Sequence, residues 1–493
     1  MAVGGRVFGA GGIRWQFGRL SRTVIGGQWL VPAAVAAVVA AVAGIWYALA
    51  LPVLPTVLIG VTAFNLLVGA TEAIWRLYGW RTPNAGEQIA WPDPVAPGRE
   101  QLAFDLIVPL RDEANVIVDT LHGLMRQSHP QYRIVVSLCD DDESTIEAVR
   151  AVVRENLHDN VQRTIRDNRI TVIVDHYANP TKAQQLNRAL EVCMGDVIGV
   201  IDAEDDVAED LLVHTEALFE RTGADVVQGG VQLMNLGRGL DKWFQVHNVL
   251  EYFFWFTSRM AFHADSGFVP LGGNTVFVRR GLLEEAGGWP LSITEDCALG
   301  VQLSTEFGAK VATAYSAALT TREEVPPSIF NKKVGSLFWQ RDRWVRGFLQ
   351  EFIAGRWLKM PKLRQKALAG YILATPILQA LSFILVPAAI IVGLTVPTPI
   401  AVALLMFIPY IPLGIIVCTQ LIGLHDFCAQ YGKRASRWHY ASLIFLMPLY
   451  QLILSGAAAV AVYKYAVGDK TWYKTGRLAE HRAMPAHEYE SAA

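Results

Sequence analysis

Three long runs without a charged residue constrain most strongly how this chain can fold. Residues 29–71, 367–425 and 438–463 contain no Lys, Arg, Asp or Glu over 43, 59 and 26 positions. A transmembrane helix needs roughly 20 consecutive apolar residues, so the first run has room for about two spans and the second for two or three. The 493-residue chain is 52% hydrophobic with a mean hydropathy of +0.28. We therefore expect a multi-pass membrane protein.

The charged part of the chain lies between these runs and is large enough to bury a core of its own. Four arginines and no acidic residue precede the first run, which places the N-terminus in the cytoplasm by the positive-inside rule. Two crossings return the chain to the same side, so we expect a cytoplasmic soluble domain on a protein of the cell (inner or plasma) membrane. The expected segments are a tail at 1–28, a transmembrane hairpin at 29–76, the soluble domain at 79–338, interfacial helices at 339–364, a transmembrane bundle at 367–466 and a tail at 467–493.

Two features of this topology leave alternatives open. The arginines before an Ala-rich run also fit a cleaved signal peptide over residues 29–51, although a second apolar segment follows at once. At the other end, a single crossing by residues 440–463 would place Lys464 outside, against the positive-inside rule. Either this segment, interrupted by Pro448, does not cross once, or the 59-residue run contains an additional crossing or interfacial helix.

Composition and motifs argue against several other classes of protein. The net charge of −2 gives no indication of a nucleic-acid partner. The five cysteines include no C-x-x-C pair, so neither a zinc site nor a disulfide framework is indicated. The patterns G-x-x-x-x-G-K-[ST] and G-x-G-x-x-G are absent, which weakens the ATPase and dinucleotide-binding hypotheses.

Within the soluble domain, short β-branched runs alternate with helical patterns, which predicts an α/β fold with a mostly parallel sheet. The candidate strands are Phe104–Pro109, Arg133–Leu138, Ile170–Val174 and Val197–Ile201. Three of them lead directly into polar residues, at 111–113, 140–142 and 202. Ligands of open α/β sheets bind outside the carboxyl ends of the strands, so the sequence predicts a nucleotide site there.

Three acidic clusters precede a Q-x-x-R-W pattern. The clusters are Asp140-Asp141-Asp142, Asp202-Ala203-Glu204-Asp205 and Thr294-Glu295-Asp296, and the pattern is Gln340-Arg341-Asp342-Arg343-Trp344 on an apparently helical segment. Taken alone, residues 202–206 also fit a solvated acidic loop with a helix N-cap, and residues 294–296 another N-cap. The segment 339–357 likewise fits an amphipathic helix at a membrane surface.

Taken in order, these motifs resemble those of membrane-embedded family-2 glycosyltransferases, the group that includes cellulose and hyaluronan synthases. The D-A-E-D sequence resembles a variant found in a bacterial cellulose-synthase-like branch. The similarity covers about residues 106–352. The other stretches that carry it are Val108-Pro109-Leu110-Arg111-Asp112-Glu113, Asp141–Thr145, Lys182-Ala183 with Leu186-Asn187, Gly287-Gly288-Trp289, Glu323–Pro326 and Trp472-Tyr473-Lys474-Thr475.

The resemblance implies a GT-A fold inserted between transmembrane helices, and an inverting transferase that uses a nucleotide-diphosphate sugar. A UDP-sugar is favoured and a GDP-sugar is possible, with Mg²⁺ or Mn²⁺ as cofactor. Asp202 and Glu204 would hold the metal, with Asp205 as a substitute. Asp296 would be the general base, with its pKa raised by partial burial, and Glu295 the alternative.

The remaining roles concern the donor and the acceptor. Arg343 and Lys182 would bind the diphosphate, since guanidinium pairs with phosphate oxygens bidentately. Gln340 and Trp344 would bind the acceptor. The other residues implied in donor binding are Pro109, Glu113, Asp141, Asp142 and Asp202.

The favoured acceptor is a growing β-linked polysaccharide, with export coupled to synthesis. One alternative is the non-processive transfer of a sugar to a lipid acceptor from the bilayer. Another, of a different class, is a catalytically inactive transport or scaffold subunit. The aromatic-rich stretch 243–262 fits an acceptor channel or, more commonly, core packing.

Overall fold

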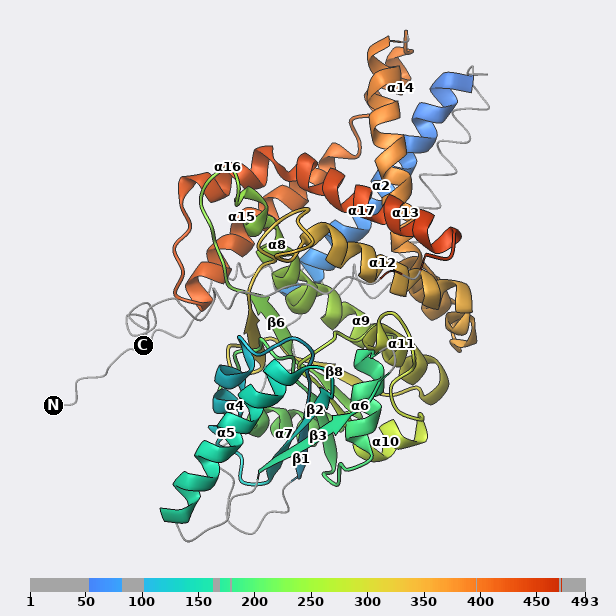
Figure 1. Ribbon diagram of the computed structural model, residues 1–493. Coiled ribbons are helices and arrows are strands. Elements are labelled where there is room, and N and C mark those ends of the chain that lie inside the picture. Colours follow the sequence, from blue (N-terminus) through green and yellow to red (C-terminus); the bar gives the residue numbers. More distant parts are fainter. Residues whose placement is uncertain are drawn as a thin grey trace, which may run out of the picture. The chain divides into compact units, whose positions relative to one another are not determined.

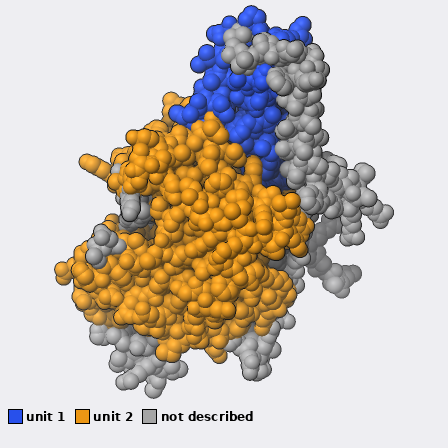
Figure 2. Space-filling view, turned by 90° about the vertical axis from the view of Figure 1, so that its right-hand side faces the viewer, with its two compact units in different colours: residues 1–77, 382–447, 485–493 blue, residues 78–381, 448–484 orange. Residues whose placement is uncertain are grey.

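The computed structural model describes residues 53–81, 102–162, 169–177, 180–395, 397–469 and 471 of the chain (Figure 1). It divides into two compact units (Figure 2). The first unit comprises residues 1–77, 382–447 and 485–493, and the second comprises residues 78–381 and 448–484. The expected tail at 1–28, the first helix of the expected hairpin and the sequence Trp472–Thr475 lie outside the described residues, as does nearly all of the expected tail at 467–493.

The second unit is built on a seven-stranded sheet with the strand order β3-β2-β1-β4-β7-β5-β8. β1 (Phe104–Pro109) pairs in parallel with β2 (Tyr132–Cys139) and with β4 (Val197–Val200), and β2 pairs in parallel with β3 (Ile170–Asp175). All four candidate strands are thus confirmed, with ends that differ by at most one residue. The side chains of β1, β2 and β4 are almost all buried, as expected for parallel strands covered on both faces.

The other half of the sheet is mixed. β7 (Val276–Arg279) runs antiparallel to β4 and to β5 (Val226–Gln228), and β5 pairs in parallel with β8 (Val311–Thr313). A separate parallel pair is formed by β6 (Gly230–Leu233) and β9 (Thr320–Glu323). The predicted α/β fold with a mostly parallel sheet is confirmed.

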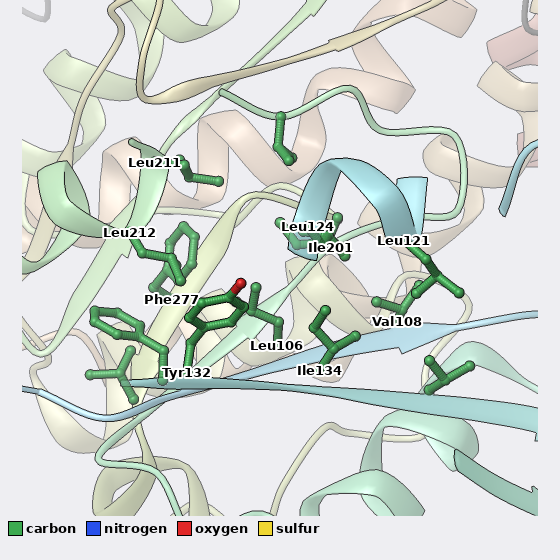
Figure 3. Packing of buried hydrophobic residues seen from close by; sticks show 14 of the residues in the cluster. Leu106, Val108, Leu121, Leu124, Tyr132, Ile134, Ile201, Leu211, Leu212 and Phe277 are labelled. Atoms are coloured by element: carbon green, nitrogen blue, oxygen red, sulfur yellow. The ribbon is translucent and has the colours of Figure 1, made fainter. Parts of the chain in front are cut away.

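One hydrophobic core joins the sheet to its helices (Figure 3). Leu106 and Ile134 contribute from the strands, and Leu121 from α4 (Ile117–Met125). Leu211 and Leu212 contribute from α7 (Leu211–Thr222). The remaining helices beside the sheet are α5 (Glu143–Gln162), α6 (Lys182–Leu190), α10 (Arg280–Glu285) and α11 (Glu295–Gln302).

The aromatic-rich stretch forms α8 (Trp243–Phe254), a π-helical turn (Trp255–Arg259) and α9 (Met260–Ser266). Most of its aromatic side chains are buried; Phe244 is 1% and Phe254 2% exposed. Phe253 makes an edge contact with Tyr315, which precedes β9. These contacts favour core packing over a channel.

Three helices are long and apolar enough to cross a membrane within the described part of the chain. They are Thr56–Gly79 within α2 (Val53–Arg81), Leu363–Thr395 (α13), and Ile400–Gln430, which contains α14 (Ile400–Leu405) and α15 (Tyr410–Gln430). A helix satisfies its own backbone hydrogen bonds, which a span requires in lipid. A fourth span is possible if α16 (Arg437–Phe445) and α17 (Met447–Ala466), which meet at a bend of 58°, count as one.

The end of α17 limits the possible topologies of the C-terminal segment. The Lys464 ammonium group pairs with Asp342 Oδ2 at 3.0 Å, and both residues belong to the second unit. Asp342 lies on α12 (Leu337–Ala354). No bilayer can separate two residues in direct contact, so a single crossing that leaves Lys464 on the far side from α12 is ruled out. Both alternatives agree with this contact, because an additional crossing within residues 367–425 would also return Lys464 to the side of α12.

Candidate active site

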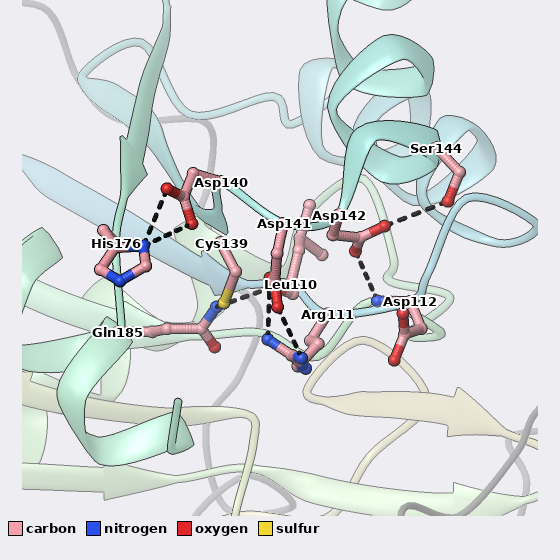
Figure 4. A network of polar contacts seen from close by, with 10 residues as sticks. All are labelled: Leu110, Arg111, Asp112, Cys139, Asp140, Asp141, Asp142, Ser144, His176 and Gln185. Carbon is pink, nitrogen blue, oxygen red and sulfur yellow. Dashed lines mark hydrogen bonds and ion pairs between the residues drawn. The ribbon is translucent and has the colours of Figure 1, made fainter. Parts of the chain in front are cut away.

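The carboxyl ends of β1 and β2 carry a network of polar side chains (Figure 4). The Arg111 guanidinium donates two hydrogen bonds of 3.1 Å to the two oxygens of Asp141. Both side chains are well exposed, and the pair raises the pKa of Arg111 through hydrogen bonding. The Asp141 carboxylate is therefore accessible to a ligand at this edge of the sheet. Pro109 is the last residue of β1, and Glu113 is fixed by a bond from its N–H to Thr145 Oγ1 (2.9 Å).

Asp142 is placed differently from its neighbour. Its Oδ2 accepts from the backbone N–H of Asp112 (2.6 Å), a residue with a left-handed φ of 53°. Its Oδ1 accepts from Ser144 Oγ (3.0 Å) and from the N–H of Thr145 (3.2 Å), which caps the N-terminus of α5. Burial would raise the pKa of Asp142, but these bonds lower it below its usual value. Asp142 thus holds the loop together, and donor contact remains a prediction.

The D-A-E-D loop follows β4 and is anchored by the buried side chain of Asn274. Asn274 Nδ2 donates to Asp205 Oδ1 (2.8 Å) and to Glu323 Oε1 (2.6 Å), and Asp205 Oδ2 accepts from the N–H of Asp202 (2.8 Å). Glu204 is 8% and Asp205 1% exposed, so the alternative of a solvated acidic loop is wrong. Burial and the carboxylates of Glu323, Asp202 and Glu204 hold the pKa of Asp205 well above its usual value.

The chain just after Gly272-Gly273 is strained. Thr275, just before β7, has a φ of 50°, which is rare for a β-branched residue. Its hydroxyl is 2.7 Å from that of Thr321 on β9, which holds the residue in place. A methyl group added at Gly273 would lie 3.2 Å from Asp296 Oδ2 and 3.7 Å from Lys182 Nζ. Backbone strain of this kind clusters at functional sites, and Gly273, two residues before Thr275, lies close to two predicted site residues.

Lys182 connects the D-A-E-D loop to the Thr294-Glu295-Asp296 motif. Thr181 and Gln184 form a capping box that starts α6 at Lys182. The Lys182 ammonium pairs with Asp202 Oδ1, donates to Gly273 O (2.8 Å) and lies 3.9 Å from Glu295 Oε1. Burial would lower the pKa of Lys182, but the carboxylates of Asp202 and Glu295 raise it above its usual value.

Glu295 and Asp296 form the first turn of α11. Burial and the neighbouring Asp296 carboxylate raise the pKa of Glu295 to about 7, against the attraction of Lys182. Burial also raises the pKa of Asp296, although Lys182 and Arg343 lower it. Thr294 occupies the N-cap position but makes no capping bond with its side chain. The environment therefore favours the protonated form of both carboxyl groups more than water does.

α12 brings the Q-x-x-R-W residues to this cluster through a close contact at Gly347. A methyl group added at Gly347 would lie 1.9 Å from Thr294 Oγ1, so only glycine allows α12 this close. Arg343 lies one turn earlier on the same helix, and its charge acts on both Glu295 and Asp296. The structure thus brings together Lys182, Asp202, Glu295, Asp296 and Arg343 from four separate stretches of sequence.

The two predicted acceptor residues, Gln340 and Trp344, both lie on α12 but differ in their surroundings. Gln340 is 3% exposed. Trp344 is half-buried, with its ring 6.0 Å from that of Tyr252 and under the Arg341 guanidinium at 4.1 Å. Arg341 in turn donates to Glu251 Oε2 at 3.0 Å. The indole is therefore held from two sides, and acceptor binding by both residues remains a prediction.

The donor set fits a hard divalent cation only in part. Asp202 and Glu204 offer carboxylate oxygens, which Mg²⁺ and Mn²⁺ prefer. Within the described residues no group of three or more His, Cys, Asp or Glu side chains is placed to hold a metal ion. Mg²⁺ is commonly bound by one or two carboxylates together with substrate phosphates. The residues therefore fit a metal that arrives with a diphosphate.

Comparison with known proteins identifies the family. The family described as "Glycosyltransferase like family 2" matches residues 101–347, which is half of the chain. This chain belongs to that family. The mostly parallel sheet of the second unit is the GT-A-like fold of a glycosyltransferase. The narrower assignment to a cellulose-synthase-like branch is not carried by this match.

Curated relatives of this family-2 glycosyltransferase are lipid glycosyltransferases by name. β-Monoglucosyldiacylglycerol synthases of Trichormus variabilis and Nostoc sp. are each 27% identical to it over 251 residues, 50% of this chain and 49% of those proteins. The same enzyme of Synechocystis sp. is 28% identical over 194 residues, 37% of this chain and 36% of that protein. The chain thus spans about half the length, or less, of the curated relatives that it matches.

Solved structures resemble the glycosyltransferase more distantly. A mannosyltransferase of Pyrobaculum calidifontis, solved with GDP-mannose and Mn²⁺, has a TM-score of 0.49 and 18% identity, covering 85% of this chain and all 100% of that one. Residues 1–349 of S. aureus TarS give a TM-score of 0.37 and 14% identity, over 75% of this chain and 92% of that one. At these TM-scores the likenesses bear on neither donor nor acceptor.

The roles of several residues that build the site were not predicted from the sequence, although Glu323 belongs to one of the motifs that carry the family resemblance. Asn274 and Glu323 hold Asp205 although they lie 69 and 118 positions away from it in the chain. Gly347 sets the approach of α12, and Thr275 carries the strain. The paired glycines before Asn274 were the one local signal, since they allow close approach of the backbone.

Proposed function

We propose that this glycosyltransferase transfers a single sugar from a nucleotide-diphosphate donor to a lipid acceptor of the diacylglycerol type. The observation that carries the proposal is the similarity to three β-monoglucosyldiacylglycerol synthases, over 50% of the chain for two of them and 37% for the third. It favours the lipid acceptor over the β-linked polysaccharide that the Q-x-x-R-W pattern suggests. An inactive scaffold loses support, because the charged side chains of the cluster are intact and held together.

The donor end of the reaction is assigned to the residues at the sheet edge. Asp141 is accessible for the nucleoside, and Arg343 and Lys182 supply positive charge for the diphosphate. Asp202 and Glu204 would hold Mg²⁺ or Mn²⁺, which neutralises the leaving diphosphate when bound. Lys182 already bridges Asp202 and Glu295, so it links the donor side of the site to the catalytic motif.

The proton transfer is assigned to Asp296. Its carboxylate accepts the proton of the acceptor hydroxyl as the oxygen attacks the anomeric carbon, and the diphosphate leaves from the opposite face. One displacement of this kind inverts the anomeric centre and gives a β linkage. The raised pKa of Asp296 improves it as a base near neutral pH. Trp344 would stack on the acceptor headgroup.

The membrane placement follows from the acceptor. A diacylglycerol resides in the bilayer, and the apolar helices α2, α13 and α15 would anchor the chain in the same bilayer. We place this unit on the cytoplasmic side of the cell membrane, where nucleotide sugars are available, in agreement with the arginines before residue 29.

The test is product identification with the purified full-length chain in nanodiscs that contain diacylglycerol. Radiolabelled UDP- and GDP-sugars are supplied with Mg²⁺ or Mn²⁺, and lipid extracts are separated from water-soluble polymer. A labelled monoglycosyl lipid, absent with Asp296→Asn and present with the exposed Asp241→Asn as control, supports the proposal. A long labelled polymer without labelled lipid would contradict the proposal and support polysaccharide synthesis.

A further inference from the structure

The chain between α12 and α13 is rich in positive charge. No Asp or Glu occurs from residue 352 to residue 425. Five basic residues fall within eleven positions of the same stretch: Arg356, Lys359, Lys362, Arg364 and Lys366. We call residues 353–366 the basic segment. All of it belongs to the second unit.

The basic segment also exposes large apolar side chains. Ile353, Leu358 and Leu363 are 61%, 54% and 73% exposed. Lys359, Lys362 and Arg364 are exposed beside them. A surface that alternates exposed apolar and basic side chains is typical of segments that lie in the headgroup region of a bilayer.

The shape of the segment is fixed by its own packing. α12 ends at Gly355, whose φ is 72°. The Trp357 ring then stacks on Phe352 at 5.6 Å and donates from Nε1 to Phe352 O at 3.0 Å. A methyl group added at Gly370 would lie 2.8 Å from the Trp357 ring, so α13 packs directly on it. The cations are therefore presented by an ordered turn.

The position of the basic segment indicates which kind of ligand it binds. Leu363 starts α13, the apolar helix that runs to Thr395 and is long enough to cross a membrane. The cations thus stand where the chain would enter the bilayer. Clusters of four to eight basic residues next to a span attract anionic lipid headgroups, through charge complementarity.

We infer that the basic segment is a binding surface for anionic phospholipid headgroups. The inference goes beyond the proposed function, because the lipid bound here is neither donor nor acceptor. Lys359 already pairs with Glu306 at 2.8 Å, on the π-helical turn that follows α11. The test is built on Lys362 and Arg364, which are both exposed.

The experiment measures lipid selectivity without turnover. The full-length protein is reconstituted in phosphatidylcholine bilayers with a trace of spin-labelled phosphatidylglycerol or spin-labelled phosphatidylcholine. The fraction of each label immobilised by the protein gives its relative affinity. Lys362→Gln/Arg364→Gln is compared with Arg150→Gln/Arg154→Gln, which removes two exposed charges from α5, outside the basic segment.

We expect the unmodified protein to prefer the anionic lipid. The Lys362→Gln/Arg364→Gln protein should lose about fivefold or more of this preference, since each basic residue near an anionic surface contributes roughly 1 kcal/mol. The α5 control should keep it, and raising the salt concentration should weaken it in both. No preference in the unmodified protein, or an equal loss in both variants, overturns the inference and leaves the surface to an acidic soluble partner. Because no sugar transfer is measured, failure here is distinguishable from failure of the proposed function.

Discussion

Two clusters of acidic and basic side chains lie on or near α12, and they differ in how far solvent reaches their side chains. In the first, Lys182 and Asp202 each keep 27% of their side chains exposed while Lys182 reaches toward Glu295. In the second, Asp342 pairs with Arg346 at 3.1 Å and with Lys464 at 3.0 Å, and the exposed fractions of Asp342 and Arg346 are 0% and 2%. The first cluster can exchange its partners for a ligand, whereas the second is closed and holds α12 to α17.

Neighbouring turns of α12 have different roles, one in holding the fold together and one at the candidate active site. Arg346 also donates to the carbonyl oxygens of Asp469 (3.1 Å) and Thr471 (2.7 Å), which fastens the chain beyond α17. Arg343, one turn earlier, faces the carboxyl groups of α11. Changes in the closed cluster should therefore affect stability first, and changes in the open cluster should affect turnover first.

The largest effect, on the free energy of unfolding, is expected from a substitution that disrupts the closed cluster. Asp342→Asn leaves Arg346 and Lys464 buried with no countercharge from α12, which costs about 3–5 kcal/mol for one partner of a buried pair. The free energy of unfolding is measured by denaturant titration of the detergent-solubilised protein. Glu147→Gln, which removes an exposed pair with Arg154 on α5, should change it little. Equal small effects of both substitutions would show that Asp342 is not a structural lock.

The second-largest effect is expected from a substitution that displaces the open cluster and leaves its charged residues unchanged. Gly347→Ala forces a methyl group against Thr294 and shifts α12 from α11, with a cost of about 1–3 kcal/mol for overpacking. We expect kcat to fall more than tenfold while the protein stays folded, because small misplacements in an active site cost rate. Gly281→Ala on α10 meets no atom within 4 Å and serves as control. Unchanged kcat in the Gly347 variant would contradict the contact.

A third prediction concerns the pH dependence of stability. In the folded protein Glu295 has a pKa raised from 4.5 to about 7. The folded state therefore binds more protons than the unfolded state between these values, and the contribution of Glu295 to stability is lost as pH rises through about 7. Glu295→Gln should flatten this part of the profile of unfolding free energy against pH. An identical slope in both proteins would show that Glu295 ionises normally.

The smallest expected effect lies at the exposed edge of the sheet. Arg111→Gln removes the pair with Asp141, which is solvated and contributes less than about 1 kcal/mol to stability. If Asp141 binds the nucleoside, KM for the donor should change while kcat and the thermal midpoint stay close to those of the unmodified protein. A large drop in the thermal midpoint would show instead that the Arg111–Asp141 pair is needed for stability, as the closed cluster is.

The sequence predicted the elements that depend on local chemistry. β1 to β4 follow from runs of Val, Ile and Leu, and the polar residues after β1, β2 and β4 do converge at one edge of the sheet. Long-range contacts were harder to predict, because an asparagine such as Asn274 gives no local sign that its partners are Asp205 and Glu323.

The assignment of acidic residues shows the same limit. Asp141 and Asp142 are adjacent in sequence, yet one is exposed and the other caps α5, since the chain turns between them. A spacing pattern cannot distinguish a carboxylate that meets the ligand from one that holds the loop. The bend between α16 and α17 and the contact of Lys464 likewise required the fold.

The most direct test of the account separates donor binding from transfer at Asp296. Donor affinity is measured by calorimetry with Mn²⁺ present, and lipid glycosylation is measured on the same preparation, for Asp296→Asn and the unmodified protein. We expect near-equal affinity for the nucleotide sugar and a loss of transfer of at least about 100-fold, the contribution typical of a general base. If Asp296→Asn transfers sugar at the unmodified rate, the cluster around Lys182 and Arg343 is not the reacting centre.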